Sequence, residues 1–343
     1  MSIFALQITE WYRQNKRDLP WRFTNDPYKI WLSEVILQQT RVDQGLPYYS
    51  KFCQYFPDLQ ALASADEEEV LNCWKGLGYY SRARNLHSTA KFIVNSFNAS
   101  FPDSYSSLIC LKGIGPYTAA AIASFAFNEK VAVLDGNVFR VLSRYFGIDT
   151  PVDTFLGKKA FQTLANTLID DLPADNQIAE YNQGIMEFGA LQCKPKNPNC
   201  ENCMLCSSCA SYAAGKVEER PLKEKKVKSK KRYFHYLFFK QDDKTIIVKR
   251  MQKDIWAGMY DFPLIETDQP ELPLNLLNKI EVDKISGEIL HHLTHQKITA
   301  VFYHIERFPE QLEDNWIVVN TENLSNYPMS RLLEKYLESQ EII

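Results

Sequence analysis

The sequence predicts a mainly α N-terminal region, up to about residue 214, followed by a smaller α+β region. Helix signals recur through the first part, and four cysteines cluster near its end. A charged stretch then leads into segments in which apolar and polar residues alternate, as in half-buried strands. A chain of 343 residues has enough material for two or three domains with their own cores.

Composition excludes several function classes. No apolar run reaches the length of a membrane span, and Met1–Arg17 shows an amphipathic pattern rather than the apolar block of a signal peptide. Eight cysteines are present, but outside the cluster they show no disulfide framework, which favours a reducing, intracellular setting. A net charge of −3 means that any nucleic-acid footprint is local, at Lys75–Arg84 or Lys194–Lys196.

A predicted helix over Tyr28–Arg41 begins after a capping signal at Asp26 and Pro27. Glu34 has apolar neighbours on nearly every face of this helix, so we expect it to be buried. A buried carboxylate is either paired or has its pKa raised by lost solvation. The first alternative is structural, the second is typical of a catalytic acid, and this segment leaves both open.

Two glycine-rich turns come next. Gly76–Tyr80 fits either a loop that presses an aromatic ring against bases or an ordinary turn between helices. Lys112–Tyr117, with Gly113 and Gly115, joins a short helix to an alanine-rich one that begins at Pro116. Glycines allow a tight turn, and the free N–H groups of a helix start favour an anion. The pattern resembles a helix-hairpin-helix that grips a DNA phosphate, with a plain interhelical turn as the alternative.

The segment Asp135-Gly136-Asn137 ends an apolar approach and opens another helix. Asp135 or Asn137 caps that helix in the structural interpretation. In the functional interpretation, a carboxylate is held rigidly at a helix mouth that faces a cleft.

Four cysteines, Cys193, Cys200, Cys203 and Cys209, are separated by six, two and five residues. Thiolates gathered this tightly need a shared cation, which is either a structural zinc ion or an iron–sulfur cluster. The long first gap with two prolines is less typical of zinc ribbons, which use paired Cys-x-x-Cys knuckles.

After Ala214 a charged stretch, residues 215–232, is predicted to be a linker. Strands are predicted over Tyr233–Lys240, Thr245–Arg250 and Lys297–Ile305, and a short helix over Arg331–Leu337.

Taken together and in this order, the Glu34 helix, the Gly113 hairpin, Asp135-Gly-Asn and the cysteine loop resemble the MutY-type adenine DNA glycosylases of the endonuclease III, helix-hairpin-helix superfamily. Trp256–Pro263 and His291–His295 extend the resemblance over nearly the whole chain. It implies an iron–sulfur part (1–25 with 128–214), a six-helix-barrel-like part with the hairpin (26–127), the linker (215–232) and a Nudix-like domain (233–343). The Nudix box itself is absent, so we expect no hydrolysis by that domain.

The resemblance implies a monofunctional glycosylase that removes adenine opposite 8-oxoguanine or guanine from double-stranded DNA. It implies a [4Fe–4S] cluster on the four cysteines and a monomeric, cytoplasmic, nucleoid-associated protein of bacterial type without a membrane partner. Glu34 protonates the base and then activates water, while Asp135, next to Asn137, stabilises the sugar cation by its charge or by covalent capture. Tyr117 occupies the position where bifunctional relatives carry a lysine nucleophile.

Further residues are implied by position alone. Those at the adenine pocket are Arg17, Trp21, Leu37 and Gln183. Those beside the opposite base are Gln39, Thr40, Leu77 and Tyr79. Thr294 and His295 belong to a lesion-recognition loop, in which Leu293 replaces an aromatic residue of the family pattern. Gly113, Gly115, Lys194 and Lys196 are expected at DNA phosphates.

Two rival functions remain at this stage. One is a bifunctional, endonuclease III-like glycosylase and lyase for oxidised pyrimidines, which shares the hairpin and the cysteine loop. The other is a non-catalytic mismatch-binding or redox-sensing iron–sulfur module, which the presence of both Glu34 and Asp135 argues against.

Overall fold

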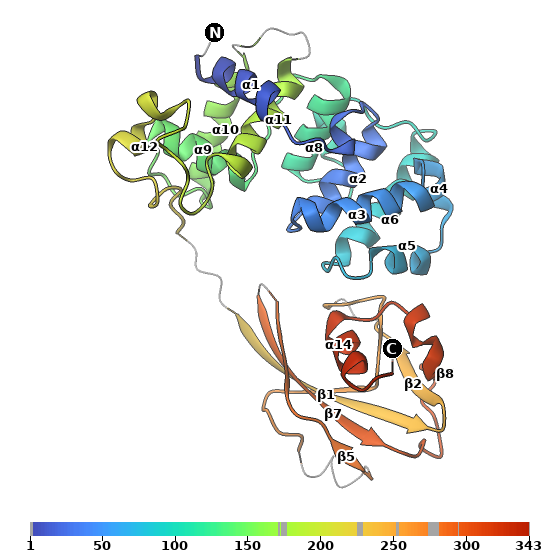
Figure 1. The fold of residues 1–343 in the computed structure, drawn as a ribbon. Helices are drawn as coiled ribbons and strands as arrows, with labels where there is room; N and C mark the ends of the chain where they lie inside the picture. Colours follow the sequence, from blue (N-terminus) through green and yellow to red (C-terminus); the bar gives the residue numbers. More distant parts are fainter. Residues whose placement is uncertain are drawn as a thin grey trace. The chain divides into compact units, whose positions relative to one another are not determined.

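The computed structural model describes residues 3–170, 172, 177–224, 229–251, 254–273, 281–293 and 295–342. The chain divides into two compact units, Met1–Ser64 with Asn85–Lys226, and Ala65–Arg84 with Val227–Ile343. The first is helical and the second is built on a sheet (Figure 1). No helix in the described ranges is long and apolar enough to cross a membrane. The predicted division of the helical region into residues 26–127 and the flanking segments stays a prediction.

Helices account for nearly all regular structure of the first unit, and α6 runs across its boundary with the second. They are α1 (Ile3–Asn15), α2 (Pro27–Leu37), α3 (Val42–Tyr55), α4 (Leu59–Ser64), α6 (Ser81–Ser96), α7 (Tyr105–Leu108), α8 (Pro116–Phe127), α9 (Gly136–Phe146), α10 (Phe155–Asp170), α11 (Gln177–Leu191) and α12 (Ala210–Ala213), with 3-10 turns η1 (Pro20–Arg22) and η2 (Cys206–Ser208).

Small residues let the helices of the first unit approach closely. Helix α8 packs against α2, and the run Ala119–Ala123 on α8 is completely buried. Helix α11 packs against both α1 and α9. A Cβ atom on Gly189 of α11 would lie 2.6 Å from the Cβ of Asn137, so only glycine permits this contact. The start of α9, with Asp135 and Asn137, is therefore held against α11.

Helix α2 ends earlier than predicted. The sequence predicted a helix to Arg41, but α2 stops at Leu37, where Gln38 turns to an extended ψ of 115° and Gln39 adopts a left-handed φ of 59°. The Thr40 N–H then bonds to the Leu37 carbonyl at 3.2 Å and closes a turn. This turn leads the chain into α3 and gives Gln38, Gln39 and Thr40 a place beside a cleft.

The second unit combines α5 with a mixed sheet. Its elements are α5 (Glu67–Trp74), β1 (Lys230–Gln241), β2 (Lys244–Lys249), β3 (Tyr260–Asp261), β4 (Leu264–Thr267), β5 (Lys284–Ile285), β6 (Ile289–His292), β7 (Gln296–Ile305), β8 (Trp316–Asn320), η3 (Thr321–Asn326) and α14 (Arg331–Ser339). Strands β1 and β7 run parallel at the centre, and the remaining pairings are antiparallel. Three strands and the terminal helix were predicted, whereas the short strands were not.

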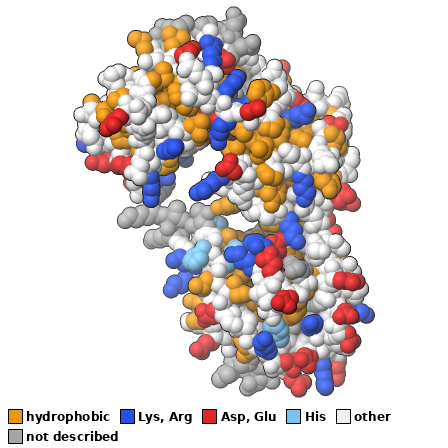
Figure 2. Space-filling view, viewed as in Figure 1, with side chains coloured by type: hydrophobic (Ala, Val, Ile, Leu, Met, Phe, Trp, Pro, Cys, Tyr) orange, Lys and Arg blue, Asp and Glu red, His pale blue; other side chains and the backbone are white. Residues whose placement is uncertain are grey.

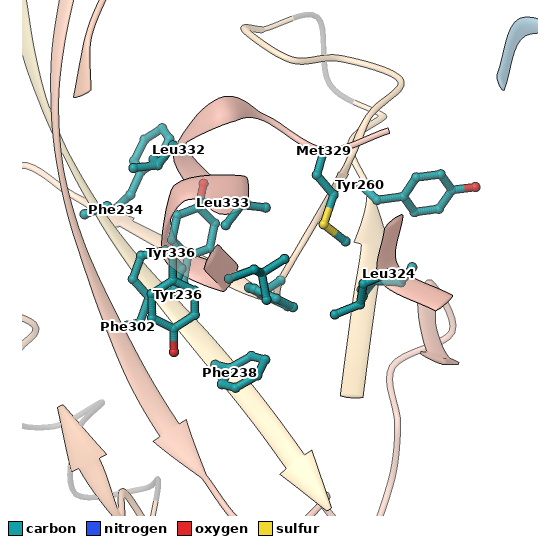
Figure 3. Close-up of a cluster of buried hydrophobic side chains, with 14 of the residues drawn as sticks. Phe234, Tyr236, Phe238, Tyr260, Phe302, Leu324, Met329, Leu332, Leu333 and Tyr336 are labelled. Atoms are coloured by element: carbon teal, nitrogen blue, oxygen red, sulfur yellow. The ribbon is translucent and has the colours of Figure 1, made fainter. Parts of the chain in front are cut away.

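The main core of this domain lies between the sheet and α14 (Figure 3). Tyr336 of α14 stacks on Phe302 of β7 with ring centroids 3.6 Å apart, and its hydroxyl lies 2.7 Å from His304 Nε2. Strand β1 begins at Lys230, inside the stretch predicted to be linker. Arg232 is buried there because Asp254 and Glu266 both accept hydrogen bonds from it.

Candidate active site

A cleft of about 720 Å³ opens in the helical unit, within the size range of ligand pockets. Its walls come from the η1 turn, the end of α2, the start of α8, the mouth of α9 and helix α11. The predicted site residues that line it are Arg17, Trp21, Glu34, Leu37, Gln39, Thr40, Tyr117, Asp135 and Asn137. Residues distant in the sequence are thus brought to one place.

Glu34 is a buried acid in this cleft, and no described ion pair includes it. Its Oε2 accepts a hydrogen bond of 2.6 Å from the Tyr117 hydroxyl, which also lies 3.2 Å from Met186 Sδ. Burial raises the pKa of Glu34 to about 7, although the Tyr117 hydrogen bond and the charge of Arg22 lower it. Of the two alternatives for Glu34, lost solvation is the one that the structure supports. A carboxyl group with this pKa is still partly protonated at neutral pH, as a general acid needs to be.

Asp135 both caps a helix and faces the cleft. Its Oδ1 accepts the Val138 N–H at 2.7 Å as the N-cap of α9, and its Oδ2 accepts the Asn137 amide at 2.7 Å. Burial raises the pKa of Asp135, and these two donors together with the charge of Arg140 oppose that rise. The capping role and a place in the cleft are therefore compatible.

Arg140 ties this mouth to the cysteine loop. Its guanidinium donates to Asn137 Oδ1 at 2.8 Å, to the Gly189 carbonyl at 2.7 Å and to the Cys193 carbonyl at 2.8 Å. One turn further on, Arg144 donates to the carbonyls of Lys194 and Pro195. Two arginines of α9 thus fix the loop that follows α11.

A buried acid on α11 was missed by the sequence analysis. Glu187 is 1% exposed and accepts hydrogen bonds from the backbone and guanidinium of Arg17 and from Arg22. Burial alone would raise the pKa of Glu187, but these cations outweigh it, and the pKa is lowered. The signal was the same as for Glu34, a carboxylate in an apolar helix. The pKa of Glu187 shifts in the opposite direction because Arg17 and Arg22 donate hydrogen bonds to it.

Gln183 does not line this cleft. It lies one turn before Glu187 on α11, and its side-chain oxygen accepts the Tyr12 hydroxyl, whose own oxygen accepts Arg22. The position matches the family pattern, but here Gln183 belongs to the polar network behind the arginines.

The residues expected beside the opposite base fall in both units. Leu77 and Tyr79 lie in the loop after α5, in the second unit. Gly76, Gly78 and Tyr79 all have left-handed φ values, of 97°, 71° and 49°. For a tyrosine this conformation is strained and needs support from its surroundings. Tyr79 is nevertheless 48% exposed.

Arg82 gives that support. It donates to the carbonyls of Leu77 and Gly78 at 3.3 Å, and its guanidinium lies 4.9 Å and 5.6 Å from the rings of Trp74 and Tyr79. Trp74 adds a 2.9 Å bond to the same Gly78 carbonyl. Hydrogen bonds from Arg82 and Trp74 thus hold the loop in its conformation, while Tyr79 stays accessible to solvent.

These contacts correct the predicted basic footprint at Lys75–Arg84. Lys75 pairs with Glu334 at 3.4 Å, Arg82 is buried under the loop, and Arg84 donates to the Ala257 carbonyl. With Lys75 paired and Arg82 buried, this stretch offers less positive charge to an external polyanion than the sequence predicted.

The Gly113 hairpin joins α7 to α8 as predicted. Gly113 has a φ of 79°, and a Cβ there would come within 2.7 Å of Asn85 Cβ, so glycine is required. Gly115 precedes Pro116 at the start of α8, and nothing lies within 4 Å of where its Cβ would be. The approach to the amide groups of this helix start is therefore open.

The cysteine loop surrounds a pocket of its own, lined by Cys193, Cys200, Cys203 and Cys209 and by a fifth cysteine, Cys206. Within the described ranges no group of three or more His, Cys, Asp or Glu residues is arranged to hold a metal ion. Burial raises the pKa of Cys200, and the neighbouring thiols add to that rise. Lys194 and Lys196 are exposed on the same loop.

In the C-terminal domain, the predicted recognition loop is the turn between β6 and β7. The Leu293 N–H bonds to the Gln296 carbonyl at 2.8 Å, which makes the turn tight, and Leu293 packs against the main core. His295 is exposed, and Thr294 lies outside the described residues.

Known proteins share this fold. Residues 32–162 match the HhH-GPD superfamily base excision DNA repair protein, and residues 235–339 match the NUDIX domain. A solved thermostable thymine-DNA glycosylase is 31% identical, with a TM-score of 0.57 over 62% of this chain and 96% of its own. An endonuclease III–DNA complex, 18% identical with a TM-score of 0.52 over 63% and 94%, shows the same fold. Fold and cleft thus define a helix-hairpin-helix glycosylase, an enzyme that cleaves N-glycosyl bonds.

The adenine DNA glycosylase of Buchnera aphidicola subsp. Schizaphis graminum is 36% identical over 332 residues, which cover 96% of this chain and 91% of the relative. The human adenine DNA glycosylase is 42% identical over 58% of this chain and 38% of its own length. The chain belongs to the adenine DNA glycosylase family.

Proposed function

We propose that this protein excises adenine paired with 8-oxoguanine or guanine in duplex DNA by hydrolysing its N-glycosidic bond. The observation that carries the proposal is the convergence of Glu34 and Asp135 on one cleft, where burial raises the pKa of both and hydrogen-bond donors oppose that rise at Asp135. Solved relatives that contain DNA support a duplex ligand, and adenine is the base in the names of the curated relatives.

In the proposed reaction the adenosine first leaves the helix stack and enters the cleft. Glu34 donates its proton to a ring nitrogen of adenine, the bond from C1′ to the base breaks, and adenine departs as a neutral molecule. The electron pair of that bond goes with the base and leaves an oxocarbenium-like sugar. Water then adds to C1′ and gives a proton to the Glu34 carboxylate, which restores the acid.

Asp135 serves the other half of this reaction. A carboxylate at the mouth of α9 stabilises positive charge on the sugar, and the Asn137 and Val138 donors hold it in one orientation. Arg140 acts on it through Asn137 and is a positioning residue. The Gly189 contact keeps Asn137 where this orientation needs it.

Tyr117 favours hydrolysis over lyase chemistry. Its hydroxyl donates to Glu34, and a phenol cannot form the Schiff base that a lyase needs. We therefore assign Tyr117 to orienting the general acid.

Excision assays test this function. Duplexes carrying adenine opposite 8-oxoguanine or guanine, or thymine opposite guanine, are incubated with the protein and cleaved with alkali. We expect strand breaks at adenine in the first two, and none at thymine. Excision of thymine alone would assign the chain to the activity named for its thymine-DNA glycosylase relative. An efficient covalent adduct after borohydride treatment would make the protein a lyase.

We further propose that Cys193, Cys200, Cys203 and Cys209 hold a [4Fe–4S] cluster. Four thiols around one pocket are the donor set such clusters use, and family membership supports the assignment. Bound there, the cluster would join the end of α11 to the loop that carries Lys194 and Lys196.

Two serine variants test whether the cluster uses the four cysteines assigned from their sequence spacing or any cysteine that lines the pocket. Cys203→Ser is expected to lose most of the iron and the visible absorbance, whereas Cys206→Ser, the fifth cysteine of the same pocket, keeps both. Iron and sulfide content of the purified proteins provide the measurement. Zinc bound by the parent protein, or equal iron loss in both variants, would contradict the assignment.

We also propose that Tyr79 enters the duplex beside the opposite base and that Arg82 positions it. Arg82→Lys removes the planar group that bridges two carbonyls and two rings. We expect roughly tenfold weaker binding of mismatched duplex and faster amide hydrogen exchange at residues 76–80, with the excision rate of bound DNA little changed. Arg13→Lys, in an exposed pair with Glu180, is the control. Equal amide hydrogen exchange at residues 76–80 in Arg82→Lys and Arg13→Lys would contradict the positioning role of Arg82.

A further inference from the structure

Three basic side chains form one row across adjacent strands at an end of the C-terminal sheet. His292 of β6 pairs in register with Lys297 of β7, and Lys297 pairs with Lys231 of β1. Register partners project from the same face of a sheet, about 5 Å apart, so the row spans about 10 Å. All three residues are exposed. Histidine and Lys or Arg side chains also adjoin one another on the face of this domain drawn in Figure 2.

The row is unfavourable for the isolated domain. Like charges directly opposite each other on neighbouring strands destabilise a sheet. No ion pair found among the described residues includes Lys231, Lys297 or His292. On the opposite face of β1, by contrast, Arg232 is neutralised by Asp254 and Glu266 at 2.6 Å. Two register-paired lysines without an ion-pair partner among the described residues, with His292 beside them, are suited to an external polyanion.

Its position suggests which polyanion. The row directly flanks the β6–β7 turn, where the Lys230 N–H bonds to the carbonyl of the exposed His295. A duplex carries a charge about every 1.7 Å, so about 10 Å of it offers several phosphates. With a net charge of −3 and Lys75 paired with Glu334, DNA binding depends on local basic surfaces, of which the exposed Lys194 and Lys196 are one and this row is a second.

We propose that His292, Lys297 and Lys231 bind the sugar–phosphate backbone of the duplex next to the β6–β7 turn. The proposal rests on the proposed function, which makes duplex DNA the ligand. Lysines act here as point charges on phosphate and carry no sequence information, so the row adds affinity and orientation. The turn itself is then presented to the bases.

The test compares two double variants in a salt titration of duplex binding. The duplex carries a 2′-fluoro adenosine, which resists hydrolysis, opposite 8-oxoguanine. Lys231→Ala/Lys297→Ala is expected to lower the slope of log K against log salt by about 2 and to weaken binding about 10- to 100-fold at 0.1 M salt. Lys244→Ala/Lys284→Ala removes two exposed lysines at the other end of the sheet and should keep the parent slope.

Two further readouts protect the interpretation. Lys231→Arg/Lys297→Arg keeps the charges and should restore the slope. The alanine pair should unfold at or above the parent temperature without DNA, because it removes a like-charge contact. A parent-like slope in the alanine pair, or equal loss in the control pair, overturns the proposal. If the protein fails to excise adenine, the proposed function fails. The same titration on undamaged duplex would still measure how much Lys231 and Lys297 contribute to DNA binding.

Discussion

Asp135→Asn is expected to lower adenine excision at least about 10³-fold while leaving the fold and the binding of lesion duplex nearly intact. Asparagine caps helices as well as aspartate does, so the bond to the Val138 N–H and the start of α9 survive. What is lost is the negative charge facing the sugar cation, together with the oxygen that accepts the Asn137 amide. Electrostatic stabilisation of this kind commonly contributes more to catalysis than any other single effect. Single-turnover excision and duplex affinity, measured side by side, separate the two effects.

Asp26→Asn is the matched control for this variant. Asp26 caps α2 through the Tyr28 N–H at 2.9 Å, so it tests the same exchange at a cap outside the cleft. We expect parent-like excision from it. Loss of duplex binding in Asp135→Asn with excision intact would contradict the role assigned to this carboxylate.

Glu34→Gln is expected to reduce excision about 10²- to 10⁴-fold, because the amide cannot give a proton to the departing base. For the parent protein, the single-turnover rate should fall as the pH rises through about 7, the pKa that burial gives Glu34. This descending limb should be absent from the residual activity of the variant. A rate that rises through the same pH range would make Glu34 the initial base instead.

The same variant should be more stable than the parent above pH 7. Folding raises the pKa of Glu34 from 4.5 to about 7, so ionised Glu34 destabilises the folded state. This destabilisation is absent below pH 4.5, where the group is protonated in both states, grows between the two pKa values and is complete above pH 7. That difference amounts to roughly 3 kcal/mol, so at pH 8 the variant should unfold at a higher temperature, and near pH 4.5 the gain should vanish. Glu334→Gln, which removes the charge of a buried carboxylate paired with the partly exposed Lys75 and Arg331, should lose stability instead. A destabilised Glu34→Gln at pH 8 would mean that Glu34 is a paired structural acid.

Local patterns in the sequence were sufficient for several parts of the site. The apolar neighbours of Glu34 predicted its burial because helix periodicity places them around it within a few turns. Gly113 and Pro116 predicted the hairpin because backbone restrictions act on the residue itself. The cysteine spacing predicted a common pocket because the loop that carries the four residues is short and cannot place them far apart. Each of these inferences depends on residues close together in the chain.

Other parts depended on contacts between distant segments. Glu34 and Glu187 give the same signal, an acid in an apolar helix. Arg17 and Arg22 donate hydrogen bonds to Glu187, and its pKa is lowered, whereas at Glu34 the charge of Arg22 only partly opposes the rise that burial causes. Arg82 was part of the predicted basic footprint and proved to be buried, with its guanidinium against the Tyr79 loop.

The sequence was therefore enough to predict the change from helices to strands, the burial of Glu34 and the cysteine loop, because backbone and periodicity rules act over a few residues. Folding in three dimensions determined which acid keeps its proton, which cations are already paired, and that His292, Lys297 and Lys231 share one row. Solvation and charge pairing depend on what packs nearby, and strand register is set between segments far apart in the chain.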